Sequence, residues 1–162
     1  MALAGAGLAL LPLRARASAD IEALCITCID YRFVTTDVQF FDAPPPSGGL
    51  GLYRQYDLVA LAGASLAAVS LSFPASIGAL WDHIAIARSL HHIKRVVVLD
   101  HRDCGAYKEA FRTDYKGEEE YRQHQNVMRQ MKTEFVWRKL NETLGLEFWL
   151  ASLDAAPVPV PV

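Results

Sequence analysis

The sequence predicts a single α/β domain in which helices flank a central, mainly parallel β-sheet. Segments with the composition of buried strands alternate with segments of helical periodicity, in the order strand, strand, helix, strand, helix, strand. One helical segment leads directly into the short β-branched run at residues 95–99, which is typical of a parallel strand covered on both faces. A chain of 162 residues is long enough for one domain with a substantial core.

The first half of the chain is predicted to hold two strands separated by a loop. Residues 21–30 have the composition of a buried strand and end in a cluster of polar side chains. Residues 41–51 combine three prolines with three glycines, so we expect a loop without a regular element. Residues 56–65 predict a second short strand, which breaks at Gly63.

The second half is predicted to hold two helices and two strands. Apolar residues recur at helical spacing between Pro74 and His92, and proline is accepted in the first turn of a helix. Residues 93–101 then predict a buried strand. Residues 118–144 carry another apolar stripe at helical spacing that ends before a glycine, and residues 146–153 predict the last strand.

The end of the chain, residues 154–162, alternates valine with proline. Because proline has no backbone N–H, we expect these prolines to forbid pairing in a sheet, which predicts an extended tail or a strap on the surface. We therefore assign residues 20–154 to the domain and residues 155–162 to a Pro/Val tail.

Residues 1–19 differ in composition from the rest of the chain. An apolar, glycine-rich run is followed by two arginines and then by Ala17, Ser18 and Ala19, a pattern typical of an export leader that is cleaved after Ala19. A leader predicts an exported, periplasmic protein. The alternative is a disordered or short helical extension of a cytoplasmic protein. No apolar run in the sequence reaches the length of a membrane span.

Composition narrows the classes of function. The net charge of −2 offers no broad basic surface, so nucleic acid is not an expected partner. With 52% hydrophobic and 21% charged residues, the chain is globular rather than disordered. Its three cysteines cannot all pair within one chain, which favours metal or nucleophile chemistry at Cys25, Cys28 and Cys104.

Residues that can carry chemistry follow two of the predicted strands. Cys28, Asp30 and Arg32 come at the end of the first strand, and His101 and Cys104 come at the end of the strand at 93–101. Ligands of parallel sheets gather beyond the carboxyl ends of the strands. Two thiolates and one imidazole suit zinc and leave one tetrahedral position open for catalysis. The sequence therefore predicts a catalytic zinc site at this edge.

The pattern CxDxR, followed far downstream by HxxCG, resembles that of the β-class carbonic anhydrases, and the resemblance covers residues 24–153. It implies that Cys28, His101 and Cys104 bind one zinc ion per chain. It also implies that Asp30 either fills the fourth zinc position in a closed form or pairs with Arg32 and leaves that position to water. The implied activity is reversible hydration of CO2 to bicarbonate and a proton by a zinc-bound hydroxide, in a homodimer or higher homo-oligomer.

The chain departs from the family pattern in three places. The Arg-Asn-Ala-Gly segment of the family corresponds to residues 60–63, which lack the arginine and the asparagine. The residue before the ligand histidine, commonly glycine, is Asp100, whose charge either opposes hydroxide formation or supports the site from behind. Little chain precedes the first strand once a leader is removed, whereas family members begin with helices that embrace a partner subunit.

Other functions remain open. The same zinc chemistry would serve a carbonyl sulfide or carbon disulfide hydrolase, and the departures would suit a zinc-binding or sensor protein of weak activity. A thiol redox protein using Cys25 and Cys28 is a third class, which is disfavoured because the pair lies within a predicted strand. Strand alternation faces Cys25 away from Cys28, so we expect Cys25 in the core.

Several further polar residues have less specific predictions. Asp103 is either an acceptor behind the ligands or a solvated turn residue, and Asp30 with Arg32 has the alternative of a merely structural ion pair. The remaining histidines lie in or beside helical segments, where we expect surface or helix-end positions, with proton transfer as the weaker alternative: His83, His91, His92 and His124.

Overall fold

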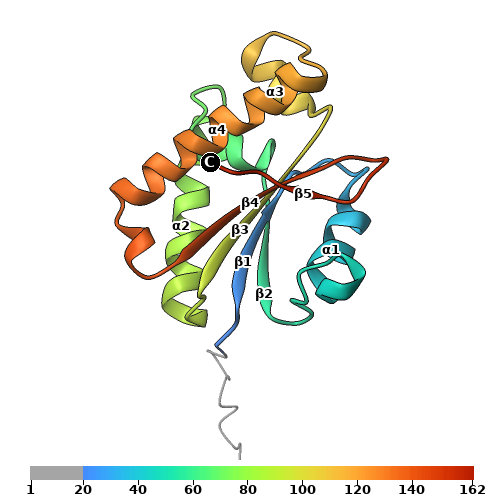
Figure 1. The fold of residues 1–162 in the computed structure, drawn as a ribbon. Helices are drawn as coiled ribbons and strands as arrows, with labels where there is room; N and C mark the ends of the chain where they lie inside the picture. The colour runs from blue at the N-terminus through green and yellow to red at the C-terminus, as the bar shows by residue number, and fades with distance from the viewer. Residues whose placement is uncertain (1–19) are drawn as a thin grey trace, which may run out of the picture.

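The computed structural model describes residues 20–162. The export leader predicted over residues 1–19 lies outside the described residues and stays a prediction. One sheet has the strand order β2-β1-β3-β4-β5, in which the first four strands are parallel and β5 is antiparallel to β4. The predicted α/β fold class is confirmed (Figure 1). The strands are β1 (Ala23–Thr27), β2 (Tyr56–Ala60), β3 (Arg95–His101), β4 (Gly145–Ala151) and β5 (Val158–Pro159).

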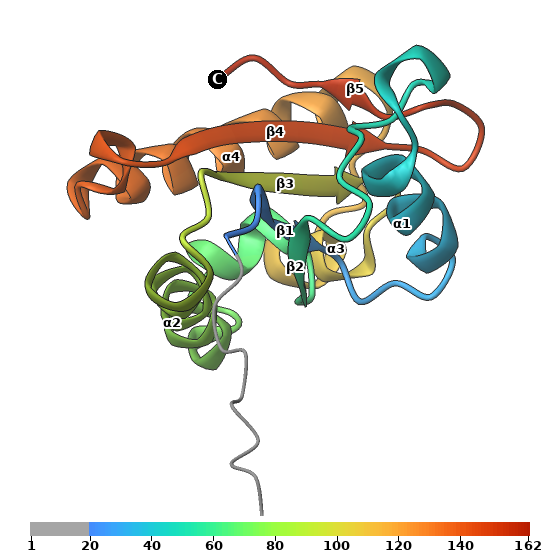
Figure 2. The same cartoon turned by 90° about the horizontal axis from the view of Figure 1, so that it is seen from below.

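Helices cover both faces of the sheet. Figure 2 shows α1 on one face and α2 and α4 on the other, and α3 lies beyond the end of β3. Over residues 20–162, no helix has the length and apolar character needed to cross a membrane. The helices are α1 (Val34–Asp42), α2 (Pro74–His91), α3 (Gly105–Phe111) and α4 (Gly117–Trp137), with short 3-10 turns η1 (Pro45–Ser47), η2 (Ala64–Ala68) and η3 (Leu140–Glu142).

Strand alternation divides the core into two parts. One face of β1 and β3 packs against α2 and α4 and contributes Leu24, Ile26, Val96 and Val98. The opposite face packs against α1 and contributes Ala23, Cys25, Val97 and Leu99. Because both faces of these strands are buried, β1 and β3 have continuous apolar sequences rather than alternating ones.

Sequence reasoning missed α1 and α3 and placed some boundaries wrongly. The segment that forms α1 includes two β-branched threonines and a buried aspartate, so its helical pattern is weak. With seven residues, α3 is too short to show a period. The predicted loop at 41–51 contains the single turn η1, and the helix predicted over 118–144 ends at Trp137.

The prediction that prolines forbid sheet pairing in the tail is wrong for residues 158–160. Val158 pairs with β4, and the Val160 N–H donates to the carbonyl of Phe148 at 2.9 Å. Because backbone groups alternate in direction along a strand, the valine N–H groups face β4, whereas Pro159 places its missing donor on the open edge. The tail thereby forms the edge strand next to β4. An edge with few free N–H groups is a poor template for pairing with a strand of another molecule.

Candidate metal centre

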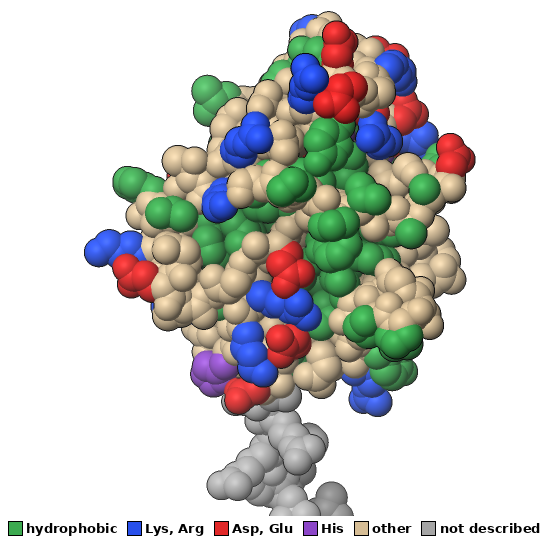
Figure 3. Space-filling model, viewed as in Figure 1, with side chains coloured by type: hydrophobic (Ala, Val, Ile, Leu, Met, Phe, Trp, Pro, Cys, Tyr) green, Lys and Arg blue, Asp and Glu red, His purple; other side chains and the backbone are tan. Residues whose placement is uncertain are grey.

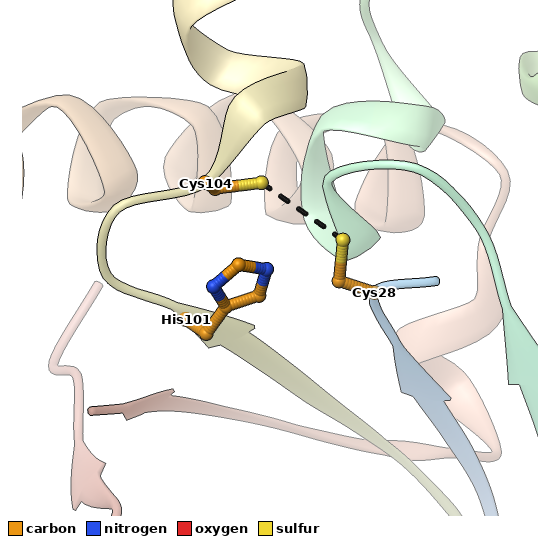
Figure 4. A group of neighbouring side chains, drawn as sticks. All are labelled: Cys28, His101 and Cys104. Carbon is orange, nitrogen blue, oxygen red and sulfur yellow. Dashed lines mark hydrogen bonds between the residues drawn. The ribbon is translucent and has the colours of Figure 1, made fainter. Parts of the chain in front are cut away.

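Cys28, His101 and Cys104 converge at the carboxyl edge of the sheet (Figure 4). Cys28 follows β1, His101 ends β3, and Cys104 immediately precedes α3. Because β1 and β3 are neighbouring parallel strands, their carboxyl ends meet at this edge. The three side chains are buried, and their possible ligand atoms all lie within 4.8 Å of one another. The structure thus brings together the three residues that the sequence predicts as metal ligands.

The donor set fits a zinc ion. The sulfur atoms of Cys28 and Cys104 are 3.9 Å apart. Two thiolates bound tetrahedrally to one zinc at about 2.3 Å would lie about 3.8 Å apart. The Nδ1–H of His101 donates to the carbonyl of Arg102 at 2.8 Å, which leaves a lone pair on Nε2. That buried Nε2 has no hydrogen-bond partner among residues 20–162, so a further group is needed to satisfy it.

Hydrogen bonds favour the thiolate form of Cys28. A hydrogen bond from the Cys104 thiol lowers the pKa of Cys28 against the opposing effect of burial, and the backbone N–H of Gly63 adds a contact of 3.3 Å to the same sulfur. The interaction with Cys28 in turn raises the pKa of Cys104. A divalent cation would replace the proton that the two sulfurs share.

Gly63 contacts Cys28, a candidate ligand, through its backbone N–H. Its φ of +78° lies in the left-handed region that glycine adopts without strain, and an added Cβ would stand 2.9 Å from the Cβ of Leu66. This turn ends the extended segment after β2, as the sequence predicts, and points the Gly63 N–H at Cys28. The segment at 60–63 therefore retains one role at the site although it lacks the arginine and asparagine of the family pattern.

Asp30 and Arg32 form a bidentate ion pair beside the ligands. The Arg32 Nε donates to Asp30 Oδ1 at 3.0 Å, and its Nη2 donates to Oδ2 at 2.7 Å. These hydrogen bonds lower the pKa of Asp30 to about 2. Asp30 Oδ2 lies 3.8 Å from the Nε2 of His101. Arg32 therefore holds an ionised carboxylate next to Nε2 of His101.

Asp103 holds Arg32 from the other side. The Arg32 Nη1 donates to Asp103 Oδ2 at 3.1 Å, and Nη2 donates to the Asp103 backbone carbonyl at 3.1 Å. Lys108 and Lys116 also donate to this carboxylate, at 2.6 Å and 2.9 Å. Hydrogen bonds from Lys108, Lys116 and Arg32 hold the pKa of Asp103 well below its usual range. Asp103 has features of both predictions: it lies in a turn with 47% of its side chain exposed, and it accepts a hydrogen bond from Arg32 beside the candidate ligands.

Asp100 lies behind the ligands in a buried hydrogen-bond network. Its Oδ2 accepts from the Tyr107 hydroxyl at 2.7 Å and from His124 Nδ1 at 2.8 Å. Ser65 donates its hydroxyl to Oδ2 at 2.7 Å and its N–H to Oδ1 at 2.9 Å. The prediction of a surface or helix-end position is wrong for His124, which is 1% exposed because Asp100 supplies the acceptor that a buried imidazole needs. The exposed or half-buried positions predicted for the other helical histidines are confirmed for His83, His91 and His92.

Cys25 lies in the core, as predicted. It packs in the cluster under α1, on the face of β1 opposite to the one that packs against α2 and α4. Burial raises the pKa of the Cys25 thiol far above its ordinary value, so it is a poor nucleophile. These features disfavour a redox pair of Cys25 with Cys28.

Asp37 is a buried acid that sequence reasoning missed. It lies on α1, is 3% exposed, and accepts a hydrogen bond from the Thr27 hydroxyl at the end of β1. Its Oδ1 has no hydrogen-bond partner within residues 20–162. Burial raises the pKa of Asp37 to about 6. The sequence signal that could have indicated a buried acid is an acidic residue flanked by apolar residues, in a segment for which no helix or strand was predicted.

The raised pKa of Asp37 predicts a pH-dependent stability. Because the unfolded chain loses this proton near pH 4 and the folded chain near pH 6, the free energy of unfolding should fall across that interval and stay lower above it. Asp37→Asn should remove this loss and stabilise the protein by about 2–3 kcal/mol above pH 6, with no gain below about pH 4. Urea unfolding in a chelator across this range measures the difference. Asp82→Asn, at an exposed position of α2, is the control. Parallel stability curves for wild type and Asp37→Asn would contradict the prediction.

Comparisons with known proteins bear mainly on the fold. No protein-family model matches the chain. It is similar to an uncharacterized protein of Rickettsia bellii, with 37% identity over 89 residues that make up 55% of this chain, and it spans about half of that relative, 51%. It is also similar to the crystal structure of a carbonic anhydrase from Streptococcus mutans, with 19% identity, a TM-score of 0.55, and coverage of 96% of this chain and 88% of that one. A β-carbonic anhydrase of Aspergillus fumigatus matches at 17% identity and a TM-score of 0.46, over 86% of this chain and 74% of that one.

The structural similarity defines the class of fold. The chain shares its mostly parallel, helix-flanked sheet with the carbonic anhydrase of Streptococcus mutans. At 19% identity this likeness concerns the fold alone. The activity must therefore be argued from the side chains at the edge of the sheet.

Proposed function

We propose that the chain is a zinc-dependent carbonic anhydrase, which converts CO2 and water reversibly into bicarbonate and a proton. The observation that carries this proposal is the convergence of two thiols and an unpartnered imidazole nitrogen beside a restrained carboxylate. Cys28, His101 and Cys104 would hold zinc, which when bound makes water a nucleophile near neutral pH. The fold shared with a carbonic anhydrase supports the same assignment.

The chain's own residues position the reactants. Asp30 accepts no proton at neutral pH, because Arg32 lowers its pKa to about 2, so it acts as a hydrogen-bond acceptor that can orient a water molecule. Arg32 keeps that carboxylate in place, and Asp103 fixes the opposite side of the guanidinium. The pair of Asp30 and Arg32 is thus held in place beside the candidate ligands, which lowers the free-energy cost of ordering the reacting groups.

The surroundings of the sulfur atoms suit a small apolar substrate. Cys28 and Cys104 belong to a cluster with Leu66 and Val127, and Phe73 packs against its rim. A CO2 molecule that reaches the sulfur side of the site would therefore meet apolar groups and leave no polar group unpaired. Carbonyl sulfide and carbon disulfide are small and weakly polar as well, so their hydrolysis is the second candidate function.

Stopped-flow hydration of CO2 by zinc-loaded protein tests the proposal. Activity should disappear with chelation, return with zinc, and survive in Cys25→Ser, which changes a buried thiol away from the site. Carbonyl sulfide and carbon disulfide hydrolysis are measured on the same preparation. Turnover of the sulfur compounds without CO2 hydration would assign the second candidate function, and zinc binding without any turnover would indicate a binding or sensor protein.

We also propose that the chain forms a homodimer or a higher homo-oligomer. Three large apolar side chains that follow β1 are exposed near the site: Ile29 at 62%, Tyr31 at 85% and Val34 at 54%. Apolar side chains also gather over the middle of the face drawn in Figure 3. Exposed apolar surface of this kind is typical of protein interfaces.

Sedimentation at micromolar protein should therefore show at least a dimer. Tyr31→Glu should weaken the assembly at least about tenfold, because it places a charge on an apolar contact surface. Tyr53→Glu changes another exposed tyrosine and serves as the control. A monomer that keeps full activity at nanomolar concentration would refute the proposal.

A further inference from the structure

Three buried polar side chains, those of Ser65, Tyr107 and His124, meet at the carboxylate of Asp100. Ser65, Asp100 and His124 are at most 1% exposed, and Tyr107 is 6% exposed. Asp100 accepts four hydrogen bonds, two from Ser65 and one each from Tyr107 and His124. A buried carboxylate is costly unless its oxygen atoms are paired in this way, so the network is stable only when these segments stay together.

Three of the four segments in the network, β3, α3 and η2, carry, adjoin or contact a candidate metal ligand. Asp100 immediately precedes His101 in β3, and Tyr107 lies in α3, whose first residue follows Cys104. Ser65 lies in η2, two residues after Gly63, whose N–H donates to the sulfur of Cys28. The network therefore joins three stretches of backbone that together determine where the three ligand side chains stand.

The register of the sheet places Asp100 beside Cys28. Thr27 in β1 pairs with Leu99 in β3, so the next residues, Cys28 and Asp100, are level with each other. Side chains alternate along a strand, so Asp100 and His101 leave β3 on opposite faces. His124 anchors the same carboxylate to α4. Asp100 therefore lies on the same face of the sheet as Cys28, and groups from η2, α3 and α4 hold it there.

We propose that Asp100 is the positioning residue of the metal centre, and that Ser65, Tyr107 and His124 act through it to hold the ligands in a binding arrangement before metal arrives. The proposal rests on the metal-binding part of the proposed function and not on turnover. Groups that orient metal ligands from behind typically change metal affinity 10- to 100-fold when removed.

Zinc affinity measured by competition with a chelator tests this proposal, together with the visible spectrum of the Co²⁺ form, which reports ligand geometry. Tyr107→Phe removes one donor to Asp100 with little change in shape and should weaken zinc binding about 10- to 100-fold. Tyr56→Phe is the matched control, because it removes a tyrosine hydroxyl near another carboxylate, that of Asp42, at the start of β2 and remote from the candidate ligands. It should bind zinc like the wild type.

Two substitutions of His124 separate positioning from simple packing. His124→Asn places an amide N–H near the position of Nδ1 and can still donate to Asp100, so zinc affinity should stay within about threefold of wild type. His124→Leu fills similar space without a donor and should weaken zinc binding about 10- to 100-fold and alter the Co²⁺ spectrum. Thermal unfolding in the presence of a chelator measures the stability of each variant without metal. If a variant does not fold, Ser65→Ala, which removes another hydrogen-bond donor to Asp100, is measured in its place.

Unchanged zinc affinity and Co²⁺ spectra in folded Tyr107→Phe and His124→Leu would overturn the proposal and leave the proposed function standing. Equal losses in His124→Asn and His124→Leu would also overturn it, because the restored donor would then have no effect. A wild type that binds no metal would overturn both the positioning role and the proposed function.

Discussion

Replacing Cys104 with serine should abolish stable zinc binding. A serine hydroxyl ionises poorly and is a harder ligand than a thiolate, so one of the three ligands is lost. If zinc binding to such a site contributes on the order of 10 kcal/mol, the loss of a third of it lowers affinity roughly a few hundredfold. Metal analysis after dialysis should find almost no zinc in Cys104→Ser, and CO2 hydration should fall with it.

Cys25→Ser provides the matched control for this experiment. Both cysteines are buried, so both substitutions place a hydroxyl in the interior and both should lower the free energy of unfolding. Only Cys104 has its sulfur next to that of Cys28. Cys25→Ser should therefore keep about one zinc ion per chain. Equal zinc loss from the two variants would mean that the ligands are misassigned.

Arg32→Ala should retain zinc and lose at least about 99% of CO2 hydration activity, a loss at the upper end of those seen when groups behind a metal site are removed. The reason is competition for one carboxylate. Without the bidentate hydrogen bonds of Arg32, Asp30 is free to turn toward the ligands, since its Oδ2 already lies 3.8 Å from His101 Nε2. A carboxylate is a competent zinc ligand and would fill the position that the substrate needs.

Asp30→Ala should also retain zinc and lose activity, for a different reason. This variant has no carboxylate to occupy the fourth position, but it lacks the acceptor that orients water. Thiocyanate binding distinguishes the two variants: the anion should reach the metal in Asp30→Ala and be excluded in Arg32→Ala. Both measurements use zinc-loaded protein whose metal content has been verified.

Arg122→Ala is the control for the loss of an arginine, because Arg122 pairs with Glu118 on the exposed side of α4. It should keep wild-type activity and thiocyanate binding. If Arg32→Ala also keeps both, the pair of Asp30 and Arg32 has a structural role only.

Much of the fold could be predicted because it depends on local patterns. Strands β1 and β3 have continuous apolar sequences, since both faces are buried, and the apolar stripes of α2 and α4 recur at helical spacing. The candidate metal ligands could be named for a related reason. In a parallel sheet, side chains that follow neighbouring strands share one edge, so Cys28, His101 and Cys104 had to approach one another once the strands were recognised.

Tertiary structure alone decided the features that depend on contacts between residues far apart in the chain. His124 lies in a helix whose sequence allows an exposed position, and it is buried because Asp100, 24 residues earlier, offers an acceptor. The tail joins the sheet because β4 presents an open edge to its valines. Asp103 supports Arg32 because β1 and β3 are neighbours, although 71 residues separate the two side chains. The sequence by itself determined which groups could bind a metal, whereas the packing of distant segments determined which groups hold them in place, because a hydrogen bond requires a partner at a fixed distance that no local pattern specifies.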